Sequence, residues 1–151
     1  MRTKQLEDYL HGHIPLSRAM AVRVAQADDE CVVLEAPLAP NINHHATVFG
    51  GSASALAILA GWSLLHARLS AHGPRAQLVI QRNSVEYERP LTGAFSARAT
   101  FTAASDWDGF VALLRRRGRS RITVPAVLLS QGLEAGRFSG QFVALAEGAG
   151  P

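Results

Sequence analysis

The residues best suited to carry chemistry lie together in one short segment, Asn41 to Ser52 (NINHHATVFGGS). Gly50 and Gly51 stand where a long apolar run begins, and glycine lets a ligand approach backbone N–H groups closely. If that run is a helix, its amino-terminal N–H groups would stabilise negative charge developing on a carbonyl oxygen. Asn43 offers both a donor and an acceptor, so it could hold such a carbonyl or the attacking water. Asn43, Gly50 and Gly51 are therefore candidate catalytic residues for attack of water on a carbonyl.

Two histidines, His44 and His45, lie in the same segment. An imidazole titrates near neutral pH and can act as a general base, and His45 is our candidate for that catalytic role. Adjacent loop histidines can equally be packing or solvent-exposed residues. No Cys, carboxylate or third His stands at ligand spacing, so we predict no metal site. Ser52 reads as a first-turn helix residue rather than a nucleophile, because no Ser-x-Gly elbow surrounds it.

The proposed role of Gly50 and Gly51 requires that a helix begin at these residues. The run Gly51 to Ser70 is too long and too rich in Ala and Leu for a strand, and it stops at His72-Gly73-Pro74 as helices do. Its apolar residues cover nearly every face, so we expect a central helix surrounded by protein. Shorter helices are predicted over Thr3 to Leu10 and from a Ser105 cap to Arg117, where Gly118 ends the helix.

Alternating and β-branched runs predict strands on both sides of the long helix. A hairpin is expected from Met20 to Leu38 with its turn at Asp28-Asp29, and Pro125 predicts a bulge or an edge position. Further strands are expected over Gln77 to Tyr87, Ala94 to Ala103, Ser120 to Ser130 and Arg137 to Leu145. This order predicts an α+β fold in which one antiparallel sheet wraps one helix, and such a sheet commonly covers its free face by dimerising.

Length and composition limit the class of protein. With 151 residues, 48% of them apolar, the chain is expected to form one domain, with a helical segment over 1–15 and a frayed tail over 147–151. The longest apolar run, Ala53 to Leu65, is shorter than the ~20 residues that cross a bilayer. The start, MRTKQLEDYL, lacks the apolar stretch of a signal peptide, so we expect a cytoplasmic protein. The single cysteine, Cys31, is expected in the core.

Positive charge is concentrated locally. The net charge is only +3, but five arginines lie within Arg115 to Arg121. A phosphate-bearing partner suits this cluster, so Arg117, Arg119 and Arg121 are candidate substrate-binding residues, although a solvated helix end would look the same. Aromatic residues are not interleaved with the arginines, so nucleic acid is not an expected partner, and without a membrane span a membrane is not one either.

Several other side chains have two interpretations. Counting by twos from Tyr87 and Val85 places Asn83 and Gln81 on one strand face, where they would line a binding site or bond across a dimer interface. Aromatic residues at Phe49, Trp62 and Phe101 would line an acyl tunnel or form ordinary core. The remaining substrate-binding candidates are His44, Thr47, Phe49, Ser52 and Asn83.

From Leu38 through Leu65, and more loosely to Leu145, the chain resembles hot-dog-fold thioesterases, above all the thioesterase-like domain found behind acetyltransferase domains in some bacteria. The strongest piece is PLANINHHATVFGGS followed by LAGW, with support from Tyr87-Glu88-Arg89-Pro90 and Gly118-Arg119. The resemblance implies a hot-dog fold and a homodimer or dimer of dimers. It also implies hydrolysis of an acyl-CoA or acyl-carrier-protein thioester, with no cofactor beyond the CoA or phosphopantetheine of the substrate.

The broader hot-dog thioesterases carry Asn, two residues, Gly, two residues, His-Gly-Gly, and a helix carboxylate nine residues beyond that His. Asn43, Gly50 and Gly51 keep their places in this chain, whereas the Gly, the His and the carboxylate are replaced by Ala46, Phe49 and Ile58. The base then falls to His44, His45 or a polar residue from a neighbouring strand or the partner subunit. The alternative is a non-catalytic acyl-thioester-binding domain. A hot-dog dehydratase is disfavoured because no His/Asp or His/Glu pair stands at matching positions.

Overall fold

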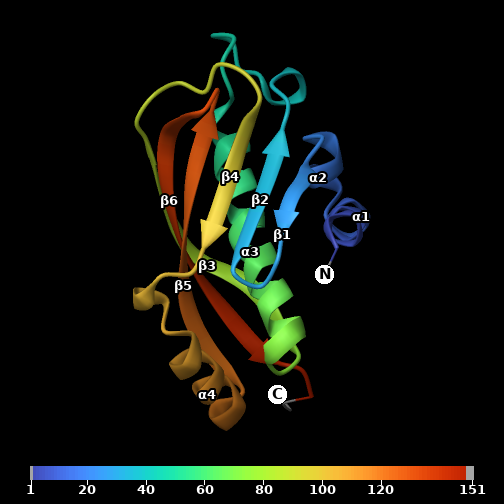
Figure 1. Ribbon diagram of the computed structural model, residues 1–151, viewed down its shortest axis with the longest axis vertical. Helices are drawn as coiled ribbons and strands as arrows, with labels where there is room; N and C mark the ends of the chain where they lie inside the picture. The colour runs from blue at the N-terminus through green and yellow to red at the C-terminus, as the bar shows by residue number, and fades with distance from the viewer. Residues whose placement is uncertain (1, 149–151) are drawn as a thin grey trace.

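The computed structural model describes residues 2–148, so the last three residues of the expected frayed tail lie outside the described part of the chain. Figure 1 shows one curved sheet with a long helix along its inner face. In chain order the elements are α1 (Thr3–His13), α2 (Pro15–Ala19), β1 (Arg23–Ala27), β2 (Cys31–Ala36), η1 (Ala39–Asn41), α3 (Gly50–His72), β3 (Ala76–Tyr87), β4 (Phe95–Thr100), η2 (Ala103–Ser105), α4 (Trp107–Arg117), β5 (Arg119–Ser130) and β6 (Leu133–Ala146).

The sheet has six strands in the order β1-β2-β4-β5-β6-β3, and every neighbouring pair is antiparallel. β3 and β4 follow each other in sequence but lie in different parts of the sheet, because β3 pairs with β6 whereas β4 lies between β2 and β5. The predicted α+β layout with one antiparallel sheet around one helix is therefore confirmed.

The core lies between α3 and the inner face of the sheet. Leu56, Ala60 and Leu64 of α3 have no solvent exposure. The helix comes close to β6 at Gly61, where an added Cβ would lie 3.0 Å from the Phe142 ring, so glycine allows the tight packing there. Cys31 is buried as expected.

One stripe of α3 is less covered than its composition predicts. Ala55, Ile58, Trp62 and His66 are only half-buried, and their spacing of three or four residues places them on one side of the helix. Tyr9 of α1 stacks on Trp62 and His66, and the Trp62 indole donates to the Leu78 carbonyl of β3. The stripe therefore lies between α1 and β3. The expectation of a helix surrounded by protein holds on the sheet side only, because six strands do not close around it.

The two edge strands differ in how they are covered. Along β1, the Glu7 carboxylate of α1 accepts a hydrogen bond from the Val24 N–H at 2.9 Å, and the His11 ring lies 2.7 Å from the Val22 carbonyl oxygen. Along β3, with 12 residues the longer edge, no strand or helix of the described residues pairs with the backbone on the far side from β6. The sheet therefore has one edge closed by α1 and one open edge.

One local expectation needs correction, and the expected edge position of Pro125 is confirmed. Asp106, not Ser105, caps α4: it adopts a left-handed conformation at φ 50°, and its carboxylate accepts from the Gly109 N–H. Pro125 lies within the interior strand β5 without a bulge, directly opposite Ser139 of β6. Pairing with β4 ends at Ala126, so Pro125 has a neighbouring strand on one side only and the position is locally an edge.

Among the described residues, no helix is both long enough and apolar enough to span a membrane.

Candidate functional site

The loop between η1 and α3 is held together by the side chain of Asn43. Its Oδ1 accepts hydrogen bonds from the N–H groups of His45 (2.8 Å) and Thr47 (3.1 Å). Its Nδ2 donates to the Thr47 hydroxyl at 2.9 Å. Both ends of the amide are therefore engaged within the loop. The geometry gives Asn43 a positioning role, and direct contact of its amide with a substrate stays a prediction.

Ala46 has an unusual backbone conformation in this loop. Its φ is 62°, in the left-handed region that side chains with a Cβ disfavour. The tight turn demands it, because the Asn43 N–H bonds to the Thr47 carbonyl and the Ala46 N–H returns to the Asn43 carbonyl. This is the position at which the wider pattern has glycine, so the chain keeps the turn and carries the strain.

The N-terminus of α3 presents two unpaired donors. The N–H groups of Ser52 and Ala53 turn back to the Phe49 carbonyl, at 2.9 and 3.2 Å. Within the described residues, the N–H groups of Gly50 and Gly51 have no hydrogen-bond partner, and no side chain caps the helix. Two adjacent donors at the positive end of a 23-residue helix form a suitable site for an anionic oxygen.

The Phe49 ring lies beside this helix end. It is 58% exposed and folds back so closely on Gly51 that a Cβ added to Gly51 would overlap the ring. A side chain at position 51 would therefore have to displace the Phe49 ring from this position. In the wider pattern this position is a histidine that can move protons, whereas the phenyl ring gives only an apolar cover next to the two donors.

Tyr87, which we did not select from the sequence, also reaches the helix end. Its hydroxyl donates to the Gly50 carbonyl oxygen at 2.8 Å, from the last residue of β3. Partial burial raises the pKa of the Tyr87 hydroxyl, which favours the protonated, donating form. Two features of the sequence could have identified Tyr87. It belongs to the Tyr87-Glu88-Arg89-Pro90 segment that resembles the family, and it lies on the same strand face as Asn83.

Asn83 faces the helix side of β3, as predicted. It lies opposite Gly140, and Val85 lies opposite the buried Phe138, so both point to the inner face. Gln81 does not share this position, because the register shifts between Ile80 and Arg82 and leaves Gln81 in a bulge. Counting by twos fails wherever a bulge adds a residue. Asn83 is exposed at the open edge, so its binding role stays a prediction.

Within the described part of the chain, no side-chain contact holds His44 or His45 toward the N-terminus of α3. Both are exposed, and their ring centroids lie 3.8 Å apart. Neither imidazole has a hydrogen-bond partner among residues 2–148, and only the backbone of His45 is fixed, by Asn43. The role of His45 as base, and of His44 in binding, stays a prediction. Thr47 and Ser52 are half-buried beside them, with the Thr47 hydroxyl held by Asn43.

Ile58 occupies the usual position of the carboxylate and α3 supplies no substitute. It lies eight residues beyond Gly50, about 12 Å along the helix axis at 1.5 Å per residue, on the half-exposed stripe. The sequence of α3 contains no Asp or Glu at all. A carboxylate base from this helix is therefore excluded.

The arginine cluster lies at the other end of the fold. Arg117 ends α4, and Arg119 and Arg121 are exposed at the start of β5. Figure 1 shows α4 beside the C-terminal end of α3, and the 23 residues of α3 span about 34 Å. Within one chain, the structure does not bring these arginines to Gly50 and Gly51.

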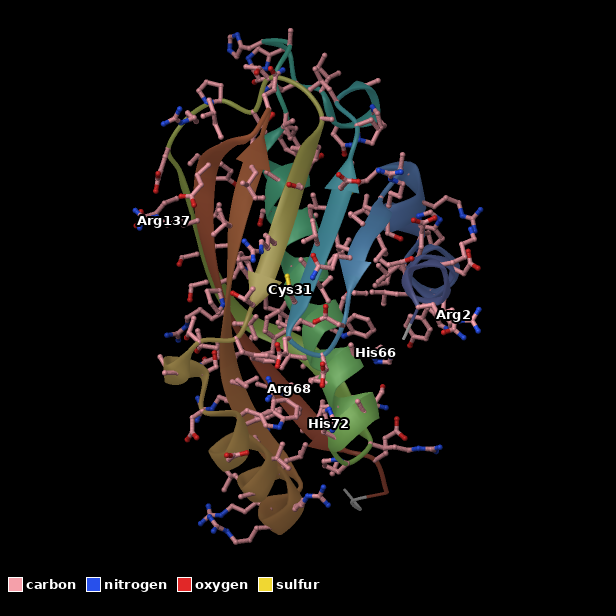
Figure 2. The ribbon with its side chains drawn as sticks, in the orientation of Figure 1. Arg2, Cys31, His66, Arg68, His72 and Arg137 are labelled. Carbon is pink, nitrogen blue, oxygen red and sulfur yellow. The ribbon has the colours of Figure 1, made fainter. Side chains whose placement is uncertain are left out.

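The three aromatic candidates for an acyl tunnel also lie apart. Phe49 is at the helix start, Trp62 stacks with Tyr9 and His66, and Phe101 contacts Arg68, whose guanidinium carbon is 4.7 Å from the ring centroid. Figure 2 shows Arg68 toward the α4 end of the molecule. These residues do not line a single tunnel within the chain.

A family model and several solved structures are similar to this chain over nearly its whole length. Residues 3–146 match the family model described as "Putative thioesterase (yiiD_Cterm)". Similar solved structures include a protein of unknown function from Chlorobaculum tepidum, 25% identical with a TM-score of 0.88, covering 96% of this chain and 94% of that chain. A "putative thioesterase" from Shewanella oneidensis is 24% identical with a TM-score of 0.83, covering 95% and 96% of the two chains.

A third structure, a "probable thioesterase" from Pseudomonas aeruginosa, is 19% identical with a TM-score of 0.82 and covers 97% of each chain. At such identities the last two likenesses concern the fold, which is the hot-dog fold predicted from the sequence. Because the family model covers nearly the whole chain, and the loop and helix start have the geometry described above, this protein belongs to that thioesterase family of the hot-dog superfamily.

Proposed function

We propose that the chain hydrolyses the thioester of an acyl-CoA or an acyl carrier protein, with the thioester carbonyl oxygen bound at the N-terminus of α3. The family and the fold support acyl-thioester hydrolysis as the general activity. The observation that carries the finer proposal is the pair of unpaired N–H groups of Gly50 and Gly51, held beside the Asn43 loop.

In the proposed reaction a water molecule attacks the carbonyl carbon and gives a tetrahedral intermediate. The negative charge on the former carbonyl oxygen is stabilised by the two glycine N–H groups, and the helix dipole adds to this stabilisation. The C–S bond then breaks, the sulfur leaves as a thiolate that takes up a proton, and the acyl group leaves as a carboxylic acid. Asn43 acts by holding the loop, and His45 is our candidate to accept the proton of the attacking water.

The proposed active form is a homodimer, alone or paired into a dimer of dimers. The open edge of β3 supports a second copy as the partner, because the β1 edge is already covered by α1. Val79 on this edge is 53% exposed, and the apolar stripe of α3 lies next to it. A partner strand at this edge would cover both and would bring further polar groups toward Asn83.

A non-catalytic acyl-thioester-binding domain is the second candidate. It is favoured by the one specific departure from the wider pattern, Ile58 in place of a carboxylate on a helix without acids. Such a binding domain would use the glycine N–H donors and the Asn43 loop to hold the thioester, and it would need no general base.

Steady-state hydrolysis of a panel of acyl-CoAs, followed by release of the free thiol, tests the proposal. We expect multiple turnovers with the wild type, and a lower kcat/KM in Asn43→Ala because the loop loses its internal bonds. Tight binding of the panel without turnover at any chain length would favour the binding domain. An unchanged kcat/KM in Asn43→Ala would contradict the role of the loop.

A further inference from the structure

We propose that Arg89 binds the phosphate at the end of the substrate's pantetheine arm, in a groove beside the α3 N-terminus. This inference rests on the proposed function, since it concerns the same thioester. It also replaces the distant Arg117, Arg119 and Arg121 with a residue close to the site.

The groove has a volume of about 390 Å³, within the range of small-molecule sites. It runs between the end of the site loop and the segment that follows β3. Its lining consists of Thr47, Val48, Tyr87, Glu88, Arg89, Pro90 and Leu91. Two larger cavities, of about 520 and 560 Å³, include no residue of the segment 41–52.

Two lining residues connect the groove to the helix end. Tyr87 donates its hydroxyl hydrogen to the Gly50 carbonyl, and Thr47 is bonded to Asn43. The Val48 N–H bonds to the Leu91 carbonyl across the groove floor at 2.9 Å, which fixes the two walls to each other. A chain-like ligand with its carbonyl at Gly50 and Gly51 can therefore continue past Tyr87 into the groove.

The groove contains one guanidinium, that of Arg89, without an ion-pair partner among residues 2–148. Glu88 is paired with Arg137, whose Nε donates to its carboxylate at 2.7 Å, and the same guanidinium lies 3.9 Å from the Glu86 carboxylate. Figure 2 shows Arg137 in the half of the molecule away from α4. Arg89 has no ion-pair partner within residues 2–148, while its backbone N–H is fixed by the Ala135 carbonyl at 3.1 Å. An exposed guanidinium on a fixed backbone is ready to meet an anion.

The chemistry of the ligand matches this arrangement. The pantetheine arm is uncharged along its length and ends in a phosphate, both in CoA and on an acyl carrier protein. An apolar and polar groove with a single cation beyond Tyr87 fits a neutral arm followed by one anionic group. Arg89 is two residues beyond Tyr87, so its backbone lies within about 7 Å of the Tyr87 backbone. The pantetheine arm is longer than this, so it would run past Tyr87 and along the groove before its phosphate meets the Arg89 guanidinium.

The experiment compares wild type, Arg89→Ala and Arg89→Lys on three substrates with one acyl group: acyl-CoA, acyl-carrier protein and acyl-pantetheine, which lacks the phosphate. We expect Arg89→Ala to raise KM about tenfold for the two phosphate-bearing substrates, as for loss of a charge-assisted contact. KM for acyl-pantetheine should stay unchanged, and Arg89→Lys should restore part of the difference. Arg98→Ala, an exposed arginine on the outer face of β4, is the matched control.

An Arg89→Ala enzyme with an unchanged KM for acyl-CoA and acyl-carrier protein would overturn the assignment, as would equal effects with and without the phosphate. A shift for only one of the two phosphate-bearing substrates would identify the physiological source of the phosphate and support the assignment. If no substrate is hydrolysed, the proposed activity fails. The inference is then decided by calorimetric binding of a non-hydrolysable acyl-CoA thioether and its pantetheine counterpart to wild type and Arg89→Ala.

Discussion

Replacing Asn43 with alanine removes the side chain that organises the site loop. Two N–H groups, of His45 and Thr47, lose their acceptor, and the Thr47 hydroxyl loses its donor. At about 1 kcal/mol for each bond, and with partial replacement by water at the exposed His45 N–H, the free energy of unfolding should fall by about 2 kcal/mol. The loop also carries the chain into Gly50, so kcat/KM should fall together with stability.

Two matched variants separate the contributions. Asn43→Asp keeps the oxygen that accepts from both N–H groups, and the Thr47 hydroxyl can donate to the carboxylate, so its loss should be under about 1 kcal/mol. Thr47→Val removes a single bond and should also cost about 1 kcal/mol or less. Urea unfolding followed by tryptophan fluorescence measures all three. An Asn43→Ala protein within about 0.5 kcal/mol of wild type, or an aspartate variant as unstable as alanine, would refute this account of the loop.

Three further predictions concern strain, pH and assembly. Ala46→Gly should raise the free energy of unfolding by about 0.5–1 kcal/mol, since relief of the left-handed strain exceeds the entropy that glycine adds to the unfolded chain. Ala71→Gly, at the exposed C-terminal end of α3, should lower the free energy of unfolding by less than the roughly 1 kcal/mol of a helix interior, and urea unfolding of the two variants should show opposite signs. Burial lowers the pKa of His66 below its ordinary 6.5, so the stability that it contributes is present above pH 6.5 and is lost as the pH falls through the lowered value. Thermal unfolding at pH 7 and pH 5 should show a smaller difference for His66→Phe than for wild type, and an equal difference would contradict this assignment. Val79→Lys at the open edge should shift the chain from dimer to monomer in light scattering, while Leu133→Lys, at nearly the same exposure (54% against 53%), should not; a wild-type monomer would contradict the proposed assembly.

Periodicity and composition were sufficient for the α+β class and the order of the main elements, because these elements have strong local signals, whereas the hot-dog fold was implied by the resemblance. The apolar run of α3, the alternation in β4 and the glycine at 118 all appear where the sequence predicts them. The failures concern single residues whose position depends on the backbone around them. A β-bulge removes Gln81 from the strand face that it was predicted to share with Asn83. Asp106, in a left-handed conformation, forms the helix N-cap that was expected of Ser105. Neither conformation has a periodic signature.

The site was predicted in part, for a related reason. Asn43, Gly50 and Gly51 are neighbours in sequence, so one segment reveals them together. Tyr87 reaches Gly50 from 37 positions away, and only the pairing of β3 with the sheet brings it there. The separation of the arginine cluster from the glycines likewise depends on the direction of α3, which local patterns do not contain.

The cover on β1 has a consequence for how copies of this chain can assemble. A sheet with two open edges can add a new copy at each end, so its growth has no natural stop and gives ribbons or fibrils. Glu7 occupies the Val24 N–H of β1, and His11 lies against the carbonyl of Val22 just before the strand, so α1 covers the start of this edge. If copies of this chain pair through the open edge of β3, as proposed, edge-to-edge growth would therefore end after two copies, because α1 lies over the other edge of each sheet.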